Sequence, residues 1–559
     1  MQTSKISALA LFATLAAACT SGKPDIRWIA STMDSPWQEM AVPSFAAESS
    51  TLIRINPADT DQTVKGFGVS FSELGWQSLG LLSEADRKAV LDELFVPGQG
   101  ASFNICRTPV GANDFSIDFY SFDETDGDFE LKDFSIDRDR QTLIPLIKEA
   151  LARNPELRIW ASPWCPPSWM KYNKHYAMRP DVVNDLPAEG RGYEGQDMFI
   201  QEEKYFDAYA RYFGRYIDAY RQEGVDLFMV MPQNEPNSDQ NFPSCCWTAA
   251  GLTRFLRHLC PEMDSRGVEV YFGTWERPKA AAIDTVMTDP EVGKYIKGLA
   301  FQWAGRSALP VARENYPDAV LVMSEQECGD GRNDWAGARH SWELMKHYLG
   351  NGVQIYDYWN ISLIKDGLSH WNWRQNSLVV VDKETGSYDF TIEYYLMKHA
   401  SHFVQPGTRR IRLDYENALA FINPDGSVVL ITSNETDQPL DITVQVGVGS
   451  AAAGAASSAV GSAVSAAAGA ASGSRSGAAL TNMAARSKRT VAAAAARAAA
   501  SDGSAAAAAA GRAASSDGSA DAAAAGRAAS SDGSAAAKAA SGSWTVSLQP
   551  QSFNTFVLK

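Results

Sequence analysis

The sequence contains few histidines and cysteines, and neither type is arranged as a metal-binding motif. Seven of the 559 residues are histidine and seven are cysteine. The histidines are scattered, and no Cys-x-x-Cys pair or His-Glu-x-x-His helix occurs. The acidic run at 123–128 lacks the closing glutamate of a calcium-binding loop, which favours a solvated turn. We therefore expect no catalytic metal and no cofactor.

The sequence also lacks long apolar runs and an excess of positive charge. No stretch after the first residues has the roughly 18 consecutive apolar residues that a membrane-spanning helix requires. Lys and Arg number 50 against 66 Asp and Glu, so the formal net charge is -16. Nucleic acid and anionic membrane surfaces repel such a chain, which argues against both as partners.

The first residues predict an export signal. Lys5 precedes a short apolar run at 6–18, which is too short to span a bilayer as a mature helix. The segment 15–19, Leu-Ala-Ala-Ala-Cys, resembles a bacterial lipoprotein box, although an ordinary signal peptide with a chance cysteine has the same pattern. We expect a signal peptide at 1–18 and a periplasmic or cell-surface lipoprotein, anchored in the outer leaflet only through a lipidated Cys19. Export permits disulfides among the other six cysteines, and the sequence does not choose among the 15 possible pairings.

Eight short apolar runs alternate with helical patterns between residues 64 and 402. Ser83 and Asp86 form a capping-box pattern at the start of a helix over 83–95. The alternation is typical of an α/β fold, either a (β/α)8 TIM barrel or a doubly wound open sheet. The count of eight and the polar or aromatic residues at most strand ends favour the barrel. The predicted strands are 64–72, 103–111, 158–164, 227–234, 268–275, 298–305, 319–325 and 356–362, and the further helices are 137–153, 202–221, 249–265, 337–349 and 391–402.

The pattern changes to short strands with turn residues after the barrel. A 95-residue stretch rich in Ala, Gly and Ser, at 449–543, separates the last two strands from the others. Its alanine runs favour helix, but Ser-Asp-Gly-Ser breaks each run and few large apolar groups are present to bury. We expect a surface insertion, whether a spacer, a repeat expansion or a sequence error, within a β-sandwich fused to the 64–402 barrel. The sandwich is built from both chain ends, at 24–63, 403–448 and 544–559, with strands expected at 409–414, 418–423, 427–433, 440–446, 544–548 and 553–558.

Two carboxylates stand at the ends of predicted barrel strands. Glu235 ends the fourth strand and Glu325 the seventh. Active sites of this fold lie at the carboxyl ends of the strands. Hydrolysis of a glycosidic bond with retention requires two carboxyls about 5–5.5 Å apart, one protonated and one ionised. Asn234, beside Glu235, is placed to bond the sugar 2-hydroxyl.

A purely structural interpretation of these carboxylates is also open. Asn-Glu-Pro at 234–236 could be a strand-ending turn, and Glu325 could be a surface charge. The occurrence of both residues at the ends of strands four and seven favours the catalytic pair. Glu327 is a rival nucleophile, but Glu325 directly ends the apolar run at 320–323.

Aromatic and charged residues recur at the same predicted face. Sugar rings stack on indole, although a single Trp is more often a core residue. Trp164 and Trp359, at strand ends, are the better candidates, and Trp303 follows strand six; Trp169, Trp371 and Trp373 are also nearby in the sequence. Arg107 and Asp114 form either a structural ion pair or two functional groups. In the second case Asp114 binds sugar hydroxyls and Arg107 keeps a catalytic carboxylate ionised.

These residues resemble glycoside hydrolase family 30, the family of lysosomal-type glucosylceramidases and microbial β-1,6-glucanases. The resemblance extends over about residues 50–445 and resumes at 544–559. It implies a barrel with a fused β-sandwich and retention of configuration, with Glu235 as acid/base and Glu325 as nucleophile. It also places Asp114, Trp164, Asn234 and Trp359 around the sugar in the −1 subsite. The matching segments are Gly66-Phe67-Gly68, Arg107-Thr108-Pro109, Asp114-Phe115-Ser116, Ala161-Ser162-Pro163-Trp164, Gln233-Asn234-Glu235-Pro236 and Ser324-Glu325.

Departures from the family pattern bear on the substrate. Glucosylceramidases carry His-Trp-Tyr after strand six, where this chain has Gln302-Trp303-Ala304. The segments 242–247, 301–305 and 324–329 look closer to the β-1,6-glucanase branch. The expected function is therefore a retaining β-1,6-glucanase with a glucan or β-glucoside substrate. A glucosylceramidase or broad β-glucosidase, and an inactive carbohydrate-binding protein, are the alternatives.

Overall fold

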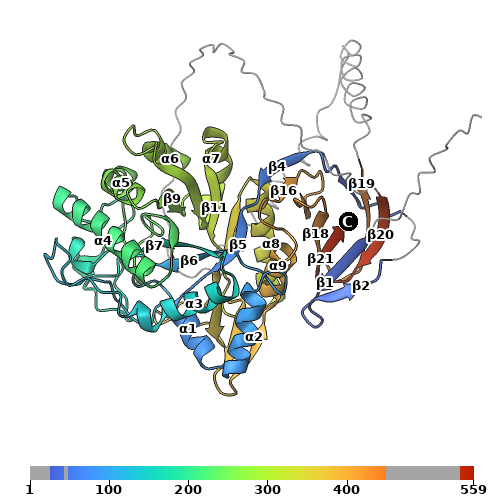
Figure 1. The fold of residues 1–559 in the computed structure, drawn as a ribbon, viewed down its shortest axis with the longest axis horizontal. Helices are drawn as coiled ribbons and strands as arrows, with labels where there is room; N and C mark the ends of the chain where they lie inside the picture. The colour runs from blue at the N-terminus through green and yellow to red at the C-terminus, as the bar shows by residue number, and fades with distance from the viewer. Residues whose placement is uncertain (1–24, 43–47, 448–541) are drawn as a thin grey trace, which may run out of the picture. The chain divides into compact units, whose positions relative to one another are not determined.

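The computed structural model of the protein describes residues 25–42, 48–447 and 542–559 (Figure 1). The expected signal peptide at 1–18, the expected lipidation site Cys19 and residues 449–541 of the expected insertion lie outside these described residues. Within the described ranges, no helix combines the length and apolar character needed to cross a membrane.

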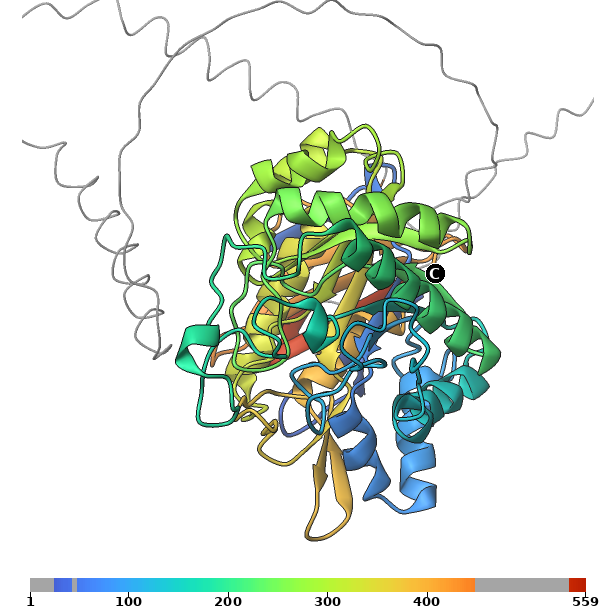
Figure 2. The ribbon, with the colours of Figure 1, turned by 90° about the vertical axis from the view of Figure 1, so that its left-hand side faces the viewer.

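Eight parallel strands close into a barrel, in which β12 pairs back to β5. All eight predicted strands are present, and Figure 2 shows them surrounded by helices. The alternative of an open doubly wound sheet is therefore wrong. The barrel strands are β5 (Gly66–Ser70), β6 (Ile105–Pro109), β7 (Arg158–Ser162), β8 (Leu227–Val230), β9 (Glu269–Trp275), β10 (Ile296–Gln302), β11 (Val320–Glu325) and β12 (Ile355–Asn360).

The six predicted helices are confirmed within a few residues. The Ser83 hydroxyl caps α2 (Glu84–Phe95) by accepting a hydrogen bond from the Asp86 backbone N–H at 3.1 Å. The segment predicted from 137 divides into a 3-10 turn at Asp139–Gln141 and α3, which starts at Leu143. The other confirmed helices are α3 (Leu143–Arg153), α4 (Glu203–Gln222), α5 (Ala249–Asp264), α8 (Trp335–Gly350) and α9 (Ile392–Ser401).

Three helices and one small sheet were not predicted. The helices have only seven or eight residues each, too few for the apolar spacing to repeat. The unpredicted elements are α1 (Glu73–Gly80), α6 (Ala280–Met287), α7 (Leu309–Asn315) and the sheet of β13 (Ser362–Ile364), β14 (Val379–Asp382) and β15 (Ser387–Phe390), with further 3-10 turns at Ser168–Met170, Ala188–Gly190 and Trp303–Ser307.

The barrel interior is packed by buried side chains that lie on alternate strand positions below the polar strand ends. Ile105, Trp160 and Val322 belong to this inner cluster. The side chain two residues further along each strand points to the same side. The sequence therefore carries Arg107, Ser162 and Ser324 inward at the carboxyl end.

The β-sandwich consists of two sheets made from both chain ends, as predicted. The larger has the order β2-β1-β21-β18-β17-β16-β4 and the smaller the order β20-β19-β3. Two strand ends differ from expectation by more than one residue: β16 stops at Ile411 and β20 starts at Gly542. The strands are β1 (Ile26–Ser31), β2 (Gln38–Met40), β3 (Leu52–Ile55), β4 (Thr60–Thr63), β16 (Arg409–Ile411), β17 (Ala418–Ile422), β18 (Val428–Asn434), β19 (Leu440–Val446), β20 (Gly542–Leu548) and β21 (Ser552–Leu558).

One buried histidine joins the sandwich to the barrel. His399 of α9 forms hydrogen bonds from Nδ1 to the Thr555 hydroxyl at 2.8 Å and from Nε2 to the Ser31 hydroxyl at 2.9 Å. The six cysteines of the described part are buried free thiols, so the structure forms no disulfide among them.

Candidate active site

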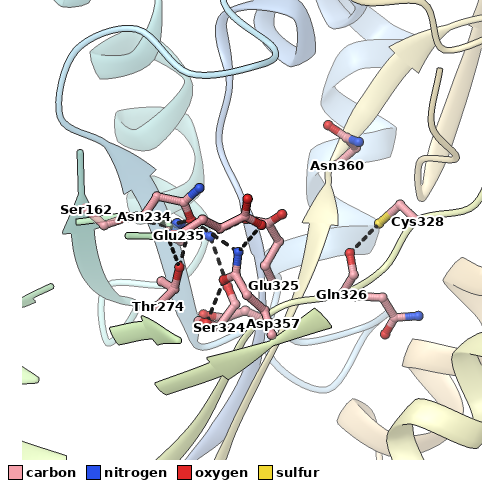
Figure 3. Close-up of polar contacts among 12 residues, drawn as sticks. Ser162, Asn234, Glu235, Thr274, Ser324, Glu325, Gln326, Cys328, Asp357 and Asn360 are labelled. Atoms are coloured by element: carbon pink, nitrogen blue, oxygen red, sulfur yellow. Dashed lines mark hydrogen bonds and ion pairs between the residues drawn. The ribbon is translucent and has the colours of Figure 1, made fainter. Parts of the chain in front are cut away.

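A cavity of about 310 Å³ lies at the carboxyl ends of the barrel strands. It contains both carboxylates that were expected to form the catalytic pair, Glu235 and Glu325. They are 8% and 5% exposed, so each is nearly buried and yet reaches the cavity. Figure 3 shows the two carboxyl groups side by side, approached by the strand-end polar residues. The lining residues are Asp114, Trp164, Asn234, Glu235, Ser238, Gln240, Phe242, Glu276, Arg277, Trp303, Ala304, Glu325, Trp373 and Gln375.

Arg107 forms an ion pair with one carboxylate of this pair. Its Nη1 donates to Glu325 Oε2 at 2.8 Å, while Nη2 donates to Asn234 Oδ1 at 2.7 Å and to the Ser162 hydroxyl at 2.8 Å. Arg107 is fully buried. Among the described residues, its ion pair is with Glu325 and none forms with Asp114. The interpretation of Arg107 and Asp114 as a structural ion pair is therefore wrong.

Glu235 has a different set of partners. Gln302 donates from Nε2 to Glu235 Oε1 at 2.9 Å, and the backbone N–H of Glu235 donates to the Thr274 hydroxyl at 3.1 Å. Gln302 in turn accepts a hydrogen bond from the Ser324 hydroxyl at 2.8 Å. A chain of hydrogen bonds thus connects the turn after β8 to the end of β11 through β10. Among the described residues, no cationic side chain forms an ion pair with Glu235 as Arg107 does with Glu325.

Burial raises the pKa of both carboxyls, and their different partners act differently on the two pKa values. The pKa of Glu325 rises to about 7 because of burial, with the Arg107 charge opposing the rise and the Glu235 charge adding to it. Burial also raises the pKa of Glu235, against hydrogen bonding by Gln302. Two adjacent carboxylates do not both ionise readily, so the pair retains one proton over a range of pH. The Arg107 guanidinium stabilises negative charge on Glu325, which favours Glu235 as the carboxyl that keeps the proton.

Asp114 contributes a third carboxylate to the cavity. It is 4% exposed, and its Oδ1 has no hydrogen-bond partner in the described structure. Burial and the charges of Glu325 and Glu235 raise the pKa of Asp114. A buried acceptor that faces a cavity without a partner is suited to a ligand hydroxyl.

The predicted tryptophans occupy different positions around the cavity. Trp164 and Trp303 line it, as does Trp373, which is 40% exposed. Trp359 is not a lining residue: its ring stacks on Trp164 with centroids 5.1 Å apart and lies 5.3 Å from the Arg107 guanidinium carbon. A contact between Trp359 and a sugar stays a prediction. Trp169 and Trp371 are buried and do not line the cavity.

Glu327, the rival of Glu325, lies away from the cavity. It forms ion pairs with Arg306 and with His340, the latter at 2.8 Å from Nε2, and these partners lower its pKa. Glu327 therefore belongs to an ion-pair cluster outside the cavity, and the preference for Glu325 as the candidate nucleophile agrees with the geometry.

The sequence did not single out several residues that complete the site. Glu276 and Arg277 follow β9 and line the cavity, and Thr274 contacts the backbone of Glu235. Gln302 was considered only as a departure from a family pattern. The position of the Glu276–Arg277 pair directly after a predicted barrel strand was the available signal, because that is where Glu235 and Glu325 also lie.

Comparison with known proteins agrees with this geometry. The Glycosyl hydrolase family 30 TIM-barrel domain matches residues 64–404, and the Glycosyl hydrolase family 30 beta sandwich domain matches residues 407–490. Lysosomal acid glucosylceramidase of Mus musculus is 28% identical over 427 residues, which cover 70% of this chain and 79% of that protein. Endo-1,6-beta-D-glucanase of Neurospora crassa is 24% identical, with coverage of 77% of this chain and 91% of that protein.

Solved structures share the architecture. The endo-beta1,6-glucanase BT3312 has a TM-score of 0.63 and 25% sequence identity, and the match covers 75% of this chain and 95% of that one. Its similarity and the domain matches extend over both the barrel and the sandwich. Since the barrel match alone spans more than half of the 559 residues, the chain belongs to glycosyl hydrolase family 30 and is a glycoside hydrolase.

Proposed function

We propose that this glycoside hydrolase cleaves β-1,6-linked glucan with retention of configuration, with Glu235 as acid/base and Glu325 as nucleophile. The observation that carries the assignment of roles is the unequal environment of the two carboxyls in one cavity. Arg107 contacts Glu325 at 2.8 Å, whereas Glu235 accepts a hydrogen bond from the neutral amide of Gln302. A nucleophile has to be ionised and an acid protonated, and these partners favour that distribution.

The reaction then has two displacements. In the first, a Glu325 oxygen bonds to the anomeric carbon as the glycosidic C–O bond breaks, and the Glu235 proton passes to the leaving oxygen. In the second, the Glu235 carboxylate takes a proton from water, whose oxygen attacks the anomeric carbon and releases Glu325. Asp114 and Asn234 bond the sugar hydroxyls, and Trp164 packs against the ring.

The choice of β-1,6-glucan rests on relatives and on the cavity lining. Both endo-1,6-glucanases named above match most of this chain and nearly all of their own length. Besides the two carboxyls, the cavity is lined by polar side chains, among them Gln240, Arg277 and Gln375, and by the aromatic rings of Phe242, Trp303 and Trp373. Polar groups between aromatic faces suit a leaving group that is itself a sugar.

Glucosylceramide is the second candidate substrate. The 28% identity to the mouse lysosomal enzyme supports it. The chemistry at Glu235 and Glu325 would be the same, and only the group that leaves would differ. Charged side chains among the lining residues, such as Glu276 and Arg277, would lose solvent beneath the two hydrocarbon chains of a ceramide, which disfavours that substrate.

Reducing-sugar release distinguishes these candidates. Wild-type protein, Glu325→Gln and the control Glu327→Gln are assayed on β-1,6-glucan, glucosylceramide, β-1,3-glucan and xylan. We expect release from β-1,6-glucan that Glu325→Gln abolishes and Glu327→Gln retains. Activity on glucosylceramide alone would replace the substrate and keep the mechanism. A wild-type protein that binds glucan without turnover would instead identify a carbohydrate-binding protein.

We also propose that the chain is exported and lipidated at Cys19. The support is the sequence pattern alone: a positive residue, a short apolar run and the lipoprotein-like box at 15–19. Expression in a Gram-negative host with an alkyne-labelled fatty acid should label the wild-type chain and leave Cys19→Ser unlabelled. An unlabelled wild type that is still cleaved near residue 18 would indicate an ordinary signal peptide.

A further inference from the structure

A carboxyl that the proposed mechanism does not use lies beside Glu235. Glu276 follows the last residue of β9, lines the same cavity and is 1% exposed. Burial and the Glu235 charge raise its pKa to about 8, with the Arg277 charge opposing the rise. Burial of an ionisable group is unfavourable unless hydrogen-bond partners compensate for the lost solvent, so a carboxyl this buried requires such partners.

The contacts of Glu276 are concentrated on the turn that follows Glu235. Its Oε1 accepts hydrogen bonds from the Asn237 backbone N–H at 2.8 Å and from the Ser238 hydroxyl at 3.2 Å, and its Oε2 accepts from Asn237 Nδ2 at 3.2 Å. Ser238 also lies near the Glu235 carboxyl, where it opposes the rise in the pKa of Glu235 that burial causes. One carboxyl group thus holds Asn237 and Ser238, two consecutive residues of the turn that follows Glu235.

The turn needs to be held because Glu235 has an unfavourable backbone conformation. Its φ is +47°, in the left-handed region that few non-glycine residues adopt. Such a conformation persists only where surrounding contacts fix it, and it sets the direction in which the side chain leaves the backbone. Thr274 and Glu276, at the end of β9, supply these contacts. The Thr274 hydroxyl accepts a hydrogen bond from the Glu235 backbone N–H, and the Glu276 carboxyl accepts hydrogen bonds from Asn237 and Ser238.

We propose that Glu276 is a positioning residue that keeps the Glu235 carboxyl aimed at the leaving-group oxygen. The inference rests on the proposed role of Glu235 as general acid. Protonation of the leaving group requires the acid within hydrogen-bonding reach of that oxygen, and a displacement of about 1 Å can reduce the rate by about 10²-fold. Loss of Glu276 should therefore affect acid catalysis more than it affects substrate binding or attack by Glu325.

The dependence of kcat/KM on the leaving group separates positioning from a general structural role. β-1,6-Glucan has a sugar alkoxide as leaving group and needs protonation, whereas 2,4-dinitrophenyl β-glucoside releases a phenolate that leaves without it. The variants are Glu276→Ala, the conservative Glu276→Gln, Glu235→Gln and the control Glu327→Gln. Glu327 is also a carboxylate near a strand end, partly buried, but its partners Arg306 and His340 do not line the cavity.

We expect Glu276→Ala to lose about 10²-fold in kcat/KM on the glucan and less than about threefold on the dinitrophenyl glucoside. Glu276→Gln keeps an oxygen for the Asn237 N–H and should lose less, with the same selectivity. Glu235→Gln should show the largest selective loss, and Glu327→Gln should show none. If Glu276→Ala fails to fold, the selectivity of Glu276→Gln decides the question.

Equal losses on both substrates in the Glu276 variants, with a selective loss in Glu235→Gln, would overturn the positioning role and leave the proposed function intact. Equal losses in Glu235→Gln would instead contradict its role as acid, and the inference would fall with it. Absence of wild-type activity on both substrates would contradict the β-glucosidic specificity on which both rest.

Discussion

Arg107 and Glu325 form a buried ion pair across the barrel, with Nη1 and Oε2 2.8 Å apart and side chains 0% and 5% exposed. The residues come from β6 and β11 and are separated by 218 positions in the chain. Ser162, Asn234 and the Ser324 carbonyl accept the other guanidinium hydrogen bonds, so the arginine cannot turn toward another carboxylate without losing these partners. The barrel thus fixes a positive charge at one carboxyl of the pair and not at the other.

Replacing Arg107 should shift the acidic limb of the pH profile. The Arg107 charge lowers the pKa of Glu325, and a contact of this kind is typically worth about 1–3 units. In Arg107→Met the pKa of Glu325 rises, the nucleophile ionises at higher pH, and the acidic limb of kcat/KM should move up by at least about one unit. Arg138→Met is the matched control, because it breaks the Arg138–Glu73 pair away from the cavity. An acidic limb that does not move would show that Arg107 does not govern the ionisation of the nucleophile.

The barrel and the catalytic pair could be predicted because their signals are local. Each barrel strand is a short apolar run, and Glu235 and Glu325 follow such runs directly. The seven-residue helix α7 and the eight-residue helix α6 were missed because a pattern with a period of 3.6 residues needs more than two turns to be recognised.

The partners of the catalytic pair could not be predicted, because they are set by tertiary packing. Gln302 bonds Glu235 from 67 positions away, and the packing of Trp359 behind Trp164 depends on rotamers that no spacing encodes. In the sequence, Glu276 cannot be distinguished from an ordinary surface glutamate. Only the closure of the barrel, with β9 beside β8, brings it under the turn at Asn237.

Removing the indole at Trp373 should weaken glucan binding more than turnover. Trp373 lines the cavity and is 40% exposed, which leaves a ring face available to a sugar. The loss of one aromatic packing partner is worth about 0.5–1.5 kcal/mol, so Trp373→Ala should raise KM by about 2- to 13-fold with little change in kcat. Tyr172→Ala is the control, since Tyr172 is 57% exposed and does not line the cavity. Equal KM changes in the two variants would contradict a sugar contact at Trp373.

His399→Leu should destabilise the junction of barrel and sandwich. The imidazole of His399 bonds the hydroxyls of Thr555 and Ser31, and burial lowers its pKa to about 3, so it is neutral in the folded protein. A leucine would leave these buried hydroxyls with fewer partners and reduce the free energy of unfolding by about 2 kcal/mol. Urea titration measures the change. His258→Leu, at a partly exposed histidine paired with Asp207, should change the free energy of unfolding less; an equal or larger change there would contradict the role of His399.

Stability should fall as the pH rises from about 4 to 8. Burial raises the pKa of Asp139 and Glu393 to about 7 and that of Glu276 and Asp357 to about 8. Because these folded-state values exceed the unfolded ones, the native state binds more protons in this window, and its advantage is lost as these groups ionise. Burial also lowers the pKa of His399, to about 3, and that of His402, and both act in the opposite direction below about pH 6.5, but they are two groups against these four.

Thermal melts at pH 5 and pH 8 test this dependence, and we expect the higher Tm at pH 5. Asp139→Asn removes one of the contributing carboxyls, so it should reduce the difference between the two melts. Its amide oxygen can accept from one of the hydroxyls of Tyr120 and Tyr220, and its amide nitrogen can donate to the other. Glu156→Gln, at a surface position, should leave the difference unchanged. A Tm that is equal or higher at pH 8 would mean that these buried carboxyls are ionised at little cost, which requires solvent or a counter-charge to reach them in the native state.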